Sequence, residues 1–392
     1  MKNRLNKIVL SAIVIGVIAC KKDTYYAVAD INCTIKSGNH VMHDKYQSIL
    51  DEYTNKGVVG LSVVISKPDE DLWQSASGYS NIEDNQKMNP CHLQQTASLA
   101  KSFTGVIILQ LIEEGKLGFD TKINTLLSDE VKSYIPNVDQ ITIKHLLQQT
   151  SGIPDVFSVS FFEKVMNNPE KTYTTPQLLS ILKNKKSLQT PGEKHVYSDP
   201  NFMLLSLIID RLDGDHITSY ENRIFQPLGL EMYYHNDGFP SPKGLVASYW
   251  DQYNNGKYEN ISALEIRVNH YIKGSGGVIS SPAEMVRFYE SVFTGGLINE
   301  EMLTLIKTDW VKEEAEGRMN TGYSHGFMVV ETDQGDWIGH TGLFLGSSCY
   351  VYHNIQNQTT IGVFTNTGTF SFLEKQALIY YDLWNDLRSA VE

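Results

Sequence analysis

The chain has 392 residues, of which 41% are hydrophobic and 20% are charged, so it can bury a sizeable core as an ordinary globular protein. Its formal net charge is −12 at pH 7. This acidic balance argues against nucleic acid as a partner and gives no electrostatic attraction to anionic lipid, because both need clustered basic side chains.

The first nineteen residues have the pattern of an export signal. Basic residues precede the apolar run 8–18, which is too short to span a bilayer. Val17-Ile18-Ala19-Cys20 follows and is similar to a bacterial lipobox, in which the cysteine sulfur is acylated. We therefore expect a signal peptide at 1–19 and a lipid anchor at Cys20, which predicts an exported bacterial lipoprotein of the cell envelope. A plain signal peptide with an incidental cysteine is the alternative.

Residues 20–41 show no hydrophobic period, which predicts a lipid-anchored tether. Besides Cys20, the chain has Cys33, Cys91 and Cys349. These allow one disulfide at most, and single buried thiols are the favoured interpretation. No Cys/His spacing indicates a metal site, so we expect neither metal nor cofactor.

The remaining chain, 42–392, reads as one catalytic unit with two lobes. Strands are predicted near both ends, at 58–65 and 71–79 and then at 326–332, 337–341, 347–353 and 359–365. A buried helix is predicted at 98–114, helices at 142–149, 175–183 and 201–212, and a final helix at 370–387. This order predicts an α/β (α+β) fold: an antiparallel sheet built from both termini and flanked by helices, with an all-helical lobe inserted at about 119–265.

The sequence Ser98-Leu99-Ala100-Lys101 places a hydroxyl and an amine three residues apart, on one face of the predicted buried helix. A serine is a weak nucleophile until a base takes its proton, and burial can lower the pKa of a lysine enough for that role. A second copy of the pattern starts at Ser180 and ends at Lys183, where a solvated helix face is expected.

Two later motifs could supply partners. In Tyr197-Ser198-Asp199-Pro200-Asn201, a tyrosine precedes a helix that Asp199 or Asn201 is expected to cap. Beside a cationic lysine, the tyrosine pKa is expected to fall, so that the phenol can act as a base. A packed tyrosine in a capping loop is the alternative.

The third motif, His340-Thr341-Gly342-Leu343, ends a predicted strand. Gly342 would let a ligand approach the backbone, and the Leu343 N–H could stabilise an oxyanion opposite the Ser98 N–H. His340 and Thr341 could hold a carboxylate or the leaving group. A lone histidine at a strand end is the alternative.

In this order and spacing, the three motifs resemble the active-site set of the serine β-lactamase-related family, in the branch with class C β-lactamases, D-alanyl-D-alanine carboxypeptidases and family VIII carboxylesterases. Residues 143–153 and 274–282 also look like that family, and the likeness spans about 45–388. The resemblance implies a β-lactamase/transpeptidase-like fold and an acyl-enzyme at Ser98. Lys101 and Tyr197 would move the proton, and the N–H groups of Ser98 and Leu343 would bind the oxyanion.

The chain departs from the family's pattern at Asp199, where the family most often has Asn, and at His340, where β-lactamases have Lys. Asp199 can accept from Lys101 but cannot donate, and Asn201 is the candidate for the missing donor. A mostly neutral histidine binds a substrate carboxylate less well than a lysine does.

Four functions therefore stay open. The first is a D-Ala-D-Ala carboxypeptidase acting on peptidoglycan stem peptides. A carboxylesterase or small-acyl amidase on the same site comes second, a β-lactamase third, and a catalytically silent binding protein last. Each implies a small-molecule or peptide partner.

Overall fold

The structure is a computed structural model of the full chain. It describes residues 31–35, 37–158, 161, 165, 167–168, 171–234, 241–253, 255–313, 321–368 and 375–392. The predicted signal peptide and Cys20 lie outside the described residues. No helix in those described ranges is both long enough and apolar enough to cross a membrane.

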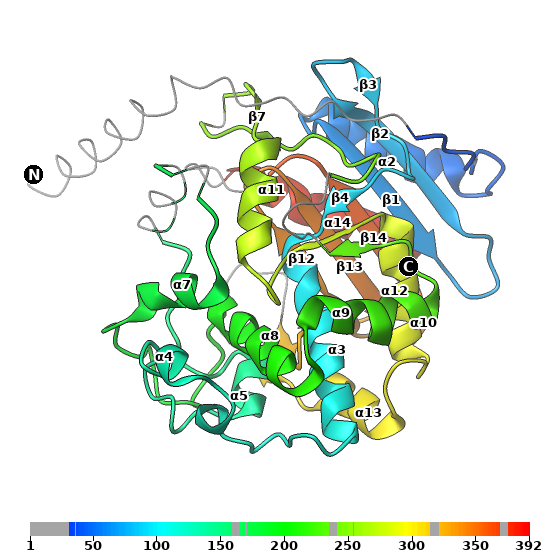
Figure 1. The fold of residues 1–392 in the computed structure, drawn as a ribbon. Coiled ribbons are helices and arrows are strands. Elements are labelled where there is room, and N and C mark those ends of the chain that lie inside the picture. The colour runs from blue at the N-terminus through cyan, green and yellow to red at the C-terminus, as the bar shows by residue number, and fades with distance from the viewer. Residues whose placement is uncertain are drawn as a thin grey trace, which may run out of the picture.

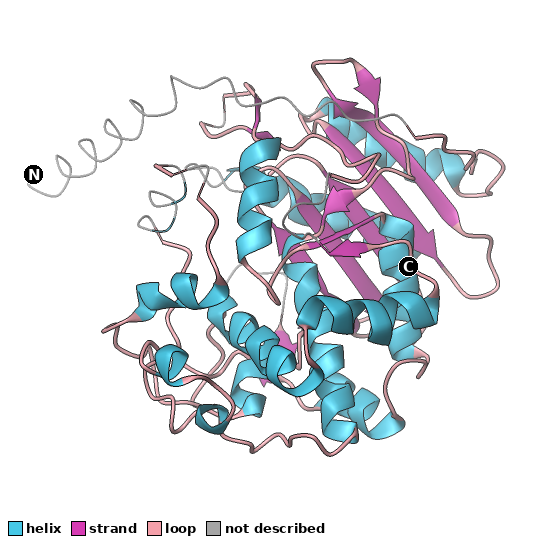
Figure 2. Cartoon of the chain, viewed as in Figure 1, coloured by secondary structure: helices cyan, strands magenta, loops and turns pink. Residues whose placement is uncertain are grey.

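A large antiparallel sheet joins the two ends of the chain (Figures 1 and 2). Its strands, in spatial order, are β3 (Gln86–Lys87), β2 (Trp73–Asn81), β1 (Gly60–Ser66), β14 (Thr360–Thr365), β13 (Ser348–Asn354), β12 (Trp337–Leu343), β11 (Phe327–Val330), β10 (Gly322–Ser324) and β9 (Val311–Lys312). The two halves meet where Leu61 on β1 pairs with Thr365 on β14. The predicted antiparallel sheet from both termini is confirmed.

Helices cover both faces of this sheet. On one side, α2 (His43–Asn55) packs on β2 and contacts α14 (Lys375–Val391). On the other side, α12 (Pro282–Phe293) packs on β1, β13 and β14. Because both faces are covered, β1 is almost entirely buried, which explains its continuous run of small and β-branched residues rather than an alternating pattern.

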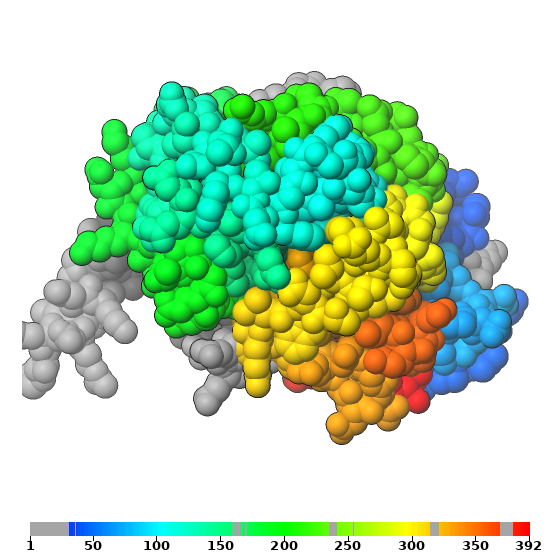
Figure 3. All heavy atoms as spheres, turned by 90° about the horizontal axis from the view of Figure 1, so that it is seen from below, coloured from blue at the N-terminus to red at the C-terminus, as the bar shows by residue number. Residues whose placement is uncertain are grey.

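The helix α3 (Ala100–Glu113) runs between the sheet and the inserted lobe, and nearly all of it is buried. Gly105 lies against the backbone of His325, where a Cβ would overlap the carbonyl oxygen, so the helix approaches this turn more closely than any larger residue permits. Seen from below, the cyan-to-green part of the chain and the yellow part beside it form one continuous surface (Figure 3).

The inserted lobe contains less helix than the sequence predicts. Its helices are α4 (Asp129–Lys132), α5 (Ile143–Leu147), α7 (Thr175–Leu179), α8 (Asp199–Asp213), α9 (His216–Tyr220) and α10 (Gln226–Leu228), with short turns η3 (Ile123–Thr125), η4 (Ser180–Leu182) and η5 (Glu221–Phe225). Loops and the short strands β5 (Tyr233–Tyr234), β6 (Tyr249–Trp250) and β7 (Glu259–Asn260) fill the rest, before α11 (Ser262–Tyr271). A small second sheet, in the order β4 (Gln94–Gln95), β8 (Val278–Ser280), β5, ties the lobe to the body. The helix α13 (Glu300–Thr308) precedes β9.

A disulfide joins Cys33 to Cys91, with the two Cα atoms 5.7 Å apart. The expectation of single buried thiols is therefore wrong for this pair, although Cys349 is a free, buried thiol as expected. The predicted tether thus becomes attached to the body at Cys33, before it reaches α2. Spacing alone could not reveal the pair, because 58 residues separate the two cysteines.

Candidate active site

Ser98 lies where the short strand β4 turns into the central helix. The turn is a 3-10 turn, η2 (Ala97–Leu99), so Ser98 directly precedes α3 rather than lying inside it. Ala97 adopts a φ of 47°, in the left-handed region that residues other than glycine seldom occupy. Strained backbone of this kind gathers at functional sites. The Ser98 side chain is only half-buried, so part of it stays accessible to solvent.

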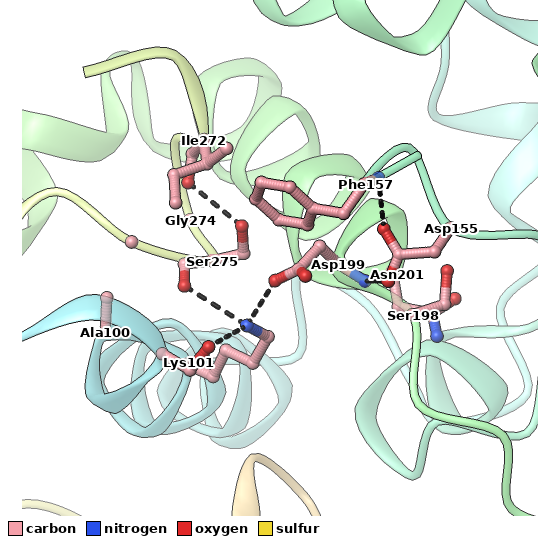
Figure 4. Close-up of polar contacts among 12 residues, drawn as sticks. Ala100, Lys101, Asp155, Phe157, Ser198, Asp199, Asn201, Ile272, Gly274 and Ser275 are labelled. Carbon is pink, nitrogen blue, oxygen red and sulfur yellow. Dashed lines mark hydrogen bonds and ion pairs between the residues drawn. The ribbon is translucent and has the colours of Figure 1, made fainter. Parts of the chain in front are cut away.

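Lys101 brings its amine to the Ser98 hydroxyl. Its Nζ lies 2.9 Å from Ser98 Oγ, 2.6 Å from Asp199 Oδ1 and 3.2 Å from the Ser275 carbonyl oxygen (Figure 4). Lys101 is fully buried, and burial lowers its pKa even though the Asp199 carboxylate acts in the opposite direction. The predicted pairing of Ser98 with a buried, perturbed lysine is thus present in the structure, and the amine is placed to accept the serine proton.

Tyr197 reaches the same hydroxyl from the loop before α8. Its side chain forms a hydrogen bond with Ser98, and its ring centroid lies 4.9 Å from the Lys101 amine. Burial, followed by the negative charge of Asp199, raises the Tyr197 pKa well above its usual value. The expectation that this pKa falls is therefore wrong, because burial and then the Asp199 charge outweigh the lowering effect of the hydrogen bond with Ser98. Tyr197 is a neutral hydroxyl at pH 7, able to donate a proton.

Asp199 is the first residue of α8, and it uses its side chain on Lys101 rather than as a cap. Ser198 occupies the N-cap position but makes no capping hydrogen bond through its side chain. The expected capping by Asp199 or Asn201 is therefore wrong. Because Pro200 stabilises the first turn without needing a donor, the Asp199 carboxylate is free to project into the cleft.

Asn201 does not face substrate. It is fully buried; its side-chain amide donates to Gln149 Oε1 and its Oδ1 accepts from Ser151 at 2.5 Å. These bonds fix the start of α8 against residues 149–151. Asn201 is therefore not positioned to replace the donor that Asp199 lacks.

His340 lies behind Tyr197 and is fully buried. Its Nδ1 donates to the Thr341 carbonyl oxygen at 2.6 Å, and its Nε2 accepts from the Tyr323 hydroxyl at 3.2 Å. Burial, with a smaller contribution from Lys101, lowers the His340 pKa to about 3, so the ring is neutral. With both ring nitrogens engaged, His340 supports the aromatic group behind Tyr197 and offers no charge to a substrate.

Thr341, Gly342 and Leu343 complete β12 beside the serine. The Thr341 hydroxyl donates to Met328 Sδ at 3.3 Å. Gly342 does allow a close approach, but the group that approaches is the protein's own Thr96 carbonyl: a Cβ at position 342 would overlap it. This contact holds β12 against η2, so that Leu343 and Ser98 lie on neighbouring segments. The oxyanion role of their N–H groups stays a prediction.

The other motif with serine and lysine lies at the surface, as expected. Lys183 is exposed, and the Ser180 hydroxyl donates to the Gln177 carbonyl oxygen within its own turn. Among the described residues, Asp210, Asp215 and His216 are close enough to share a metal ion. All three already have partners, since His216 Nδ1 bonds Asp210 at 2.6 Å and Asp215 caps α9.

Comparison with known proteins assigns this arrangement to a family. The beta-lactamase family description matches residues 46–381, which is most of the chain. The chain belongs to the beta-lactamase family. Among curated relatives, Penicillin-binding protein 4* of Bacillus subtilis is 23% identical over 344 residues, covering 82% of this chain and 71% of its own. Protein flp of Staphylococcus aureus is 31% identical over 185 residues, which cover 47% of this chain and 36% of that protein. The aligned part of this chain thus spans about a third of the length of Protein flp.

Solved structures show the same fold. D-amino acid amidase from Ochrobactrum anthropi SV3 has a TM-score of 0.76 at 20% identity, covering 90% of this chain and 99% of that chain. The octameric penicillin-binding protein homologue from Pyrococcus abyssi has a TM-score of 0.74 at 21% identity, covering 86% of this chain and 76% of that chain. The predicted β-lactamase/transpeptidase-like fold is confirmed.

Sequence reasoning missed four groups that shape the site. They are the Ser275 carbonyl on Lys101, the Tyr323 ring behind Tyr197, Gln149 against the start of α8, and the partly buried carboxyl of Asp155. Ser275 and Gln149 lie in stretches that looked family-like, which was the available signal. Nothing in the local pattern marked Asp155 or Tyr323.

Proposed function

We propose that the protein is a serine hydrolase that forms an acyl-enzyme at Ser98. The observation that carries this proposal is the convergence of the Lys101 amine, 2.9 Å away, and the Tyr197 hydroxyl on the oxygen of Ser98. An amine three residues along the chain and a phenol from the distant loop before α8 meet at one half-buried hydroxyl, which is the arrangement that activates a nucleophile. A catalytically silent binding protein would not require an activated nucleophile.

In the proposed route, the Ser98 oxygen attacks a carbonyl carbon while its proton passes to the neutral form of Lys101. The Tyr197 hydroxyl, which keeps its proton at neutral pH, donates to the departing group. Water then attacks the acyl carbon and gives a proton to the Tyr197 oxygen. The Lys101 ammonium returns its proton to the Ser98 oxygen, which restores Ser98 and releases the acid. The N–H groups of Ser98 and Leu343 are the proposed donors to the oxyanion.

For the substrate, the neutral His340 favours amides and esters without a carboxylate next to the scissile bond. A D-Ala-D-Ala stem peptide and a β-lactam both carry such a carboxylate, and a buried uncharged ring attracts it weakly. We therefore place amidase or carboxylesterase activity first. D-Ala-D-Ala carboxypeptidase activity is the second candidate, and the likeness to Penicillin-binding protein 4* favours it over β-lactamase activity.

The test is a substrate panel with and without the nucleophile. Wild-type protein is expected to hydrolyse p-nitrophenyl butyrate, and Ser98→Ala is expected to lose at least about a hundredfold in kcat/KM, since removal of a nucleophile abolishes the covalent route. The matched control is Ser180→Ala, in the surface copy of the motif, which should behave as wild type. Equal turnover by wild type and Ser98→Ala would remove the proposal. A D-Ala-D-Ala peptide and nitrocefin, run alongside, rank the other candidates.

We also propose that the mature chain is held at a membrane of the bacterial cell envelope by acylation of Cys20. The disulfide between Cys33 and Cys91 supports export, because such bonds persist in oxidising compartments. Expressed from the full gene, Cys20→Ser is expected to move from the membrane pellet to the soluble fraction, as judged by immunoblotting. Cys349→Ser is the control. Continued pelleting of Cys20→Ser would contradict the anchor.

A further inference from the structure

One oxygen of the Asp199 carboxylate has no hydrogen-bond partner among the described residues. Oδ1 accepts from Lys101, whereas Oδ2 makes no hydrogen bond with any described residue. The residue is only 7% exposed, so this oxygen is held in the cleft wall rather than in bulk water. A nearly buried carboxylate oxygen without a donor is costly unless a ligand or water supplies one.

A second carboxyl lies behind the first. Asp155 accepts the backbone N–H of Phe157 at 2.8 Å and that of Asp199 at 3.3 Å, so the two acids are linked through the first residue of α8. Figure 4 shows the order across the cleft: Lys101, Asp199, then Asp155. Burial and the Asp199 charge raise the Asp155 pKa to about 7. In the proposed route Lys101 acts as a neutral amine, so a cationic group on the substrate would be attracted by the Asp199 carboxylate and by Asp155 where it is ionised.

An aromatic surface adjoins these acids. The Phe157 ring stands beside the Asp199 carboxylate in Figure 4. Its centroid lies 4.9 Å from that of Phe161 and 6.2 Å from that of Phe344, the residue that follows β12. Phe161 and Phe344 are buried, so Phe157, which is partly exposed, is the ring that adjoins the negative charge, and this combination suits a ligand with both a cationic and an aromatic group.

Distance decides where the cation belongs on the substrate. Lys101 Nζ lies 2.9 Å from Ser98 Oγ and 2.6 Å from Asp199 Oδ1, so this carboxylate is within about 6 Å of the nucleophile. A substrate whose carbonyl carbon lies at Ser98 Oγ, and whose ammonium is on the adjacent carbon, can bridge the distance from Oγ to the Asp199 carboxylate. An ammonium several bonds further from the carbonyl carbon would lie beyond the Asp199 carboxylate.

From these contacts we propose that Asp199, supported by Asp155, binds a free α-ammonium group of the substrate, so that the enzyme prefers amides or esters of aromatic amino acids with an unblocked amine. The proposal rests on the hydrolase function proposed above and names its substrate class. Asp199 would contact the substrate directly, and Asp155 would act through it as a positioning residue.

The test compares phenylalanine amide, as each enantiomer, with 3-phenylpropanamide, which lacks only the amino group. At pH 7, where most of an α-amine with its usual pKa is an ammonium, we expect kcat/KM for the better enantiomer to exceed that for the desamino amide at least tenfold. Asp199→Asn should bring this ratio close to one, and Asp155→Asn should reduce it by less. Using the ratio within each variant cancels any general loss of catalysis. Asp129→Asn, at an exposed position on α4, is the charge-matched control and should keep the wild-type ratio.

Two outcomes would overturn the inference. A wild-type ratio of one or less would do so, as would a wild-type ratio that persists in Asp199→Asn. If neither amide is turned over, calorimetry on Ser98→Ala decides, because tighter binding of phenylalanine amide than of 3-phenylpropanamide is then required and equal binding contradicts the proposal. Ser98-dependent hydrolysis of p-nitrophenyl butyrate separates the two proposals, since it can persist when the ammonium preference is absent.

Discussion

Replacing Lys101 with alanine is expected to lower kcat/KM for p-nitrophenyl butyrate at least about a hundredfold, because the amine that takes the Ser98 proton is removed. The loss should appear in kcat more than in KM, since the amine acts in the transition state and the ester makes no ground-state contact with it. Lys183→Ala, the surface counterpart, should match wild type. Activity within tenfold of wild type in Lys101→Ala would contradict the role of the amine.

The pH dependence of wild type gives an independent measurement of the same group. A base must be unprotonated to act, so kcat/KM should rise with pH as Lys101 loses its proton. Because burial lowers the Lys101 pKa, this rise should occur below the pH expected for an exposed lysine. The rise should be missing in Lys101→Ala, whose residual activity should have a different profile.

Replacing Gly342 with alanine is expected to damage both stability and catalysis. The new Cβ would overlap the Thr96 carbonyl oxygen. Thr96 cannot easily yield, because its N–H and its hydroxyl both donate to the Val278 carbonyl oxygen on β8 at 2.9 Å. Strand β12 must therefore move away from η2, which separates Leu343 from Ser98. Displacements of about 1 Å at an active site can cost about a hundredfold in rate, and we expect a loss of that order.

The measurements are kcat/KM for p-nitrophenyl butyrate and the Tm of the purified variant. Gly118→Ala is the matched control, since a Cβ there meets nothing closer than the Thr121 hydroxyl at 3.8 Å and the backbone is not left-handed. A Gly342→Ala variant with wild-type Tm and turnover would show that β12 and η2 need not be in contact.

Much of the fold could be predicted because hydrophobic pattern and turn residues report burial directly. Strand β1, the pair β13 and β14, and helix α3 all lie within a few residues of their predicted bounds. The lobe was predicted less well, because residues 233–234, 249–250 and 259–260 form strands through tertiary pairing that has no local period. Helix α2 was missed although Tyr46, Leu50 and Tyr53, the buried residues on it, follow the i, i+4, i+7 spacing of an amphipathic helix.

The candidate site, like the fold, has some features that the local sequence predicts and others that depend on tertiary packing. The spacing of Ser98 and Lys101 on one helix face is local, so sequence reasoning could find it. The electrostatics of Tyr197 are not local, because they depend on how deeply folding buries its hydroxyl and on how close it brings Asp199 and Asp155. Similarly, His340 reads as a substrate contact until its packing against Tyr323 is known.

The disulfide at Cys33 sets how far the cleft can work from a bilayer. If Cys20 carries the lipid, thirteen residues of chain separate the anchor from the attachment point. Fully extended, such a segment reaches roughly 45 Å. Reducing agents would lengthen this segment by at most nine residues, up to the start of α2, and so increase the distance from the membrane at which the enzyme can reach substrates.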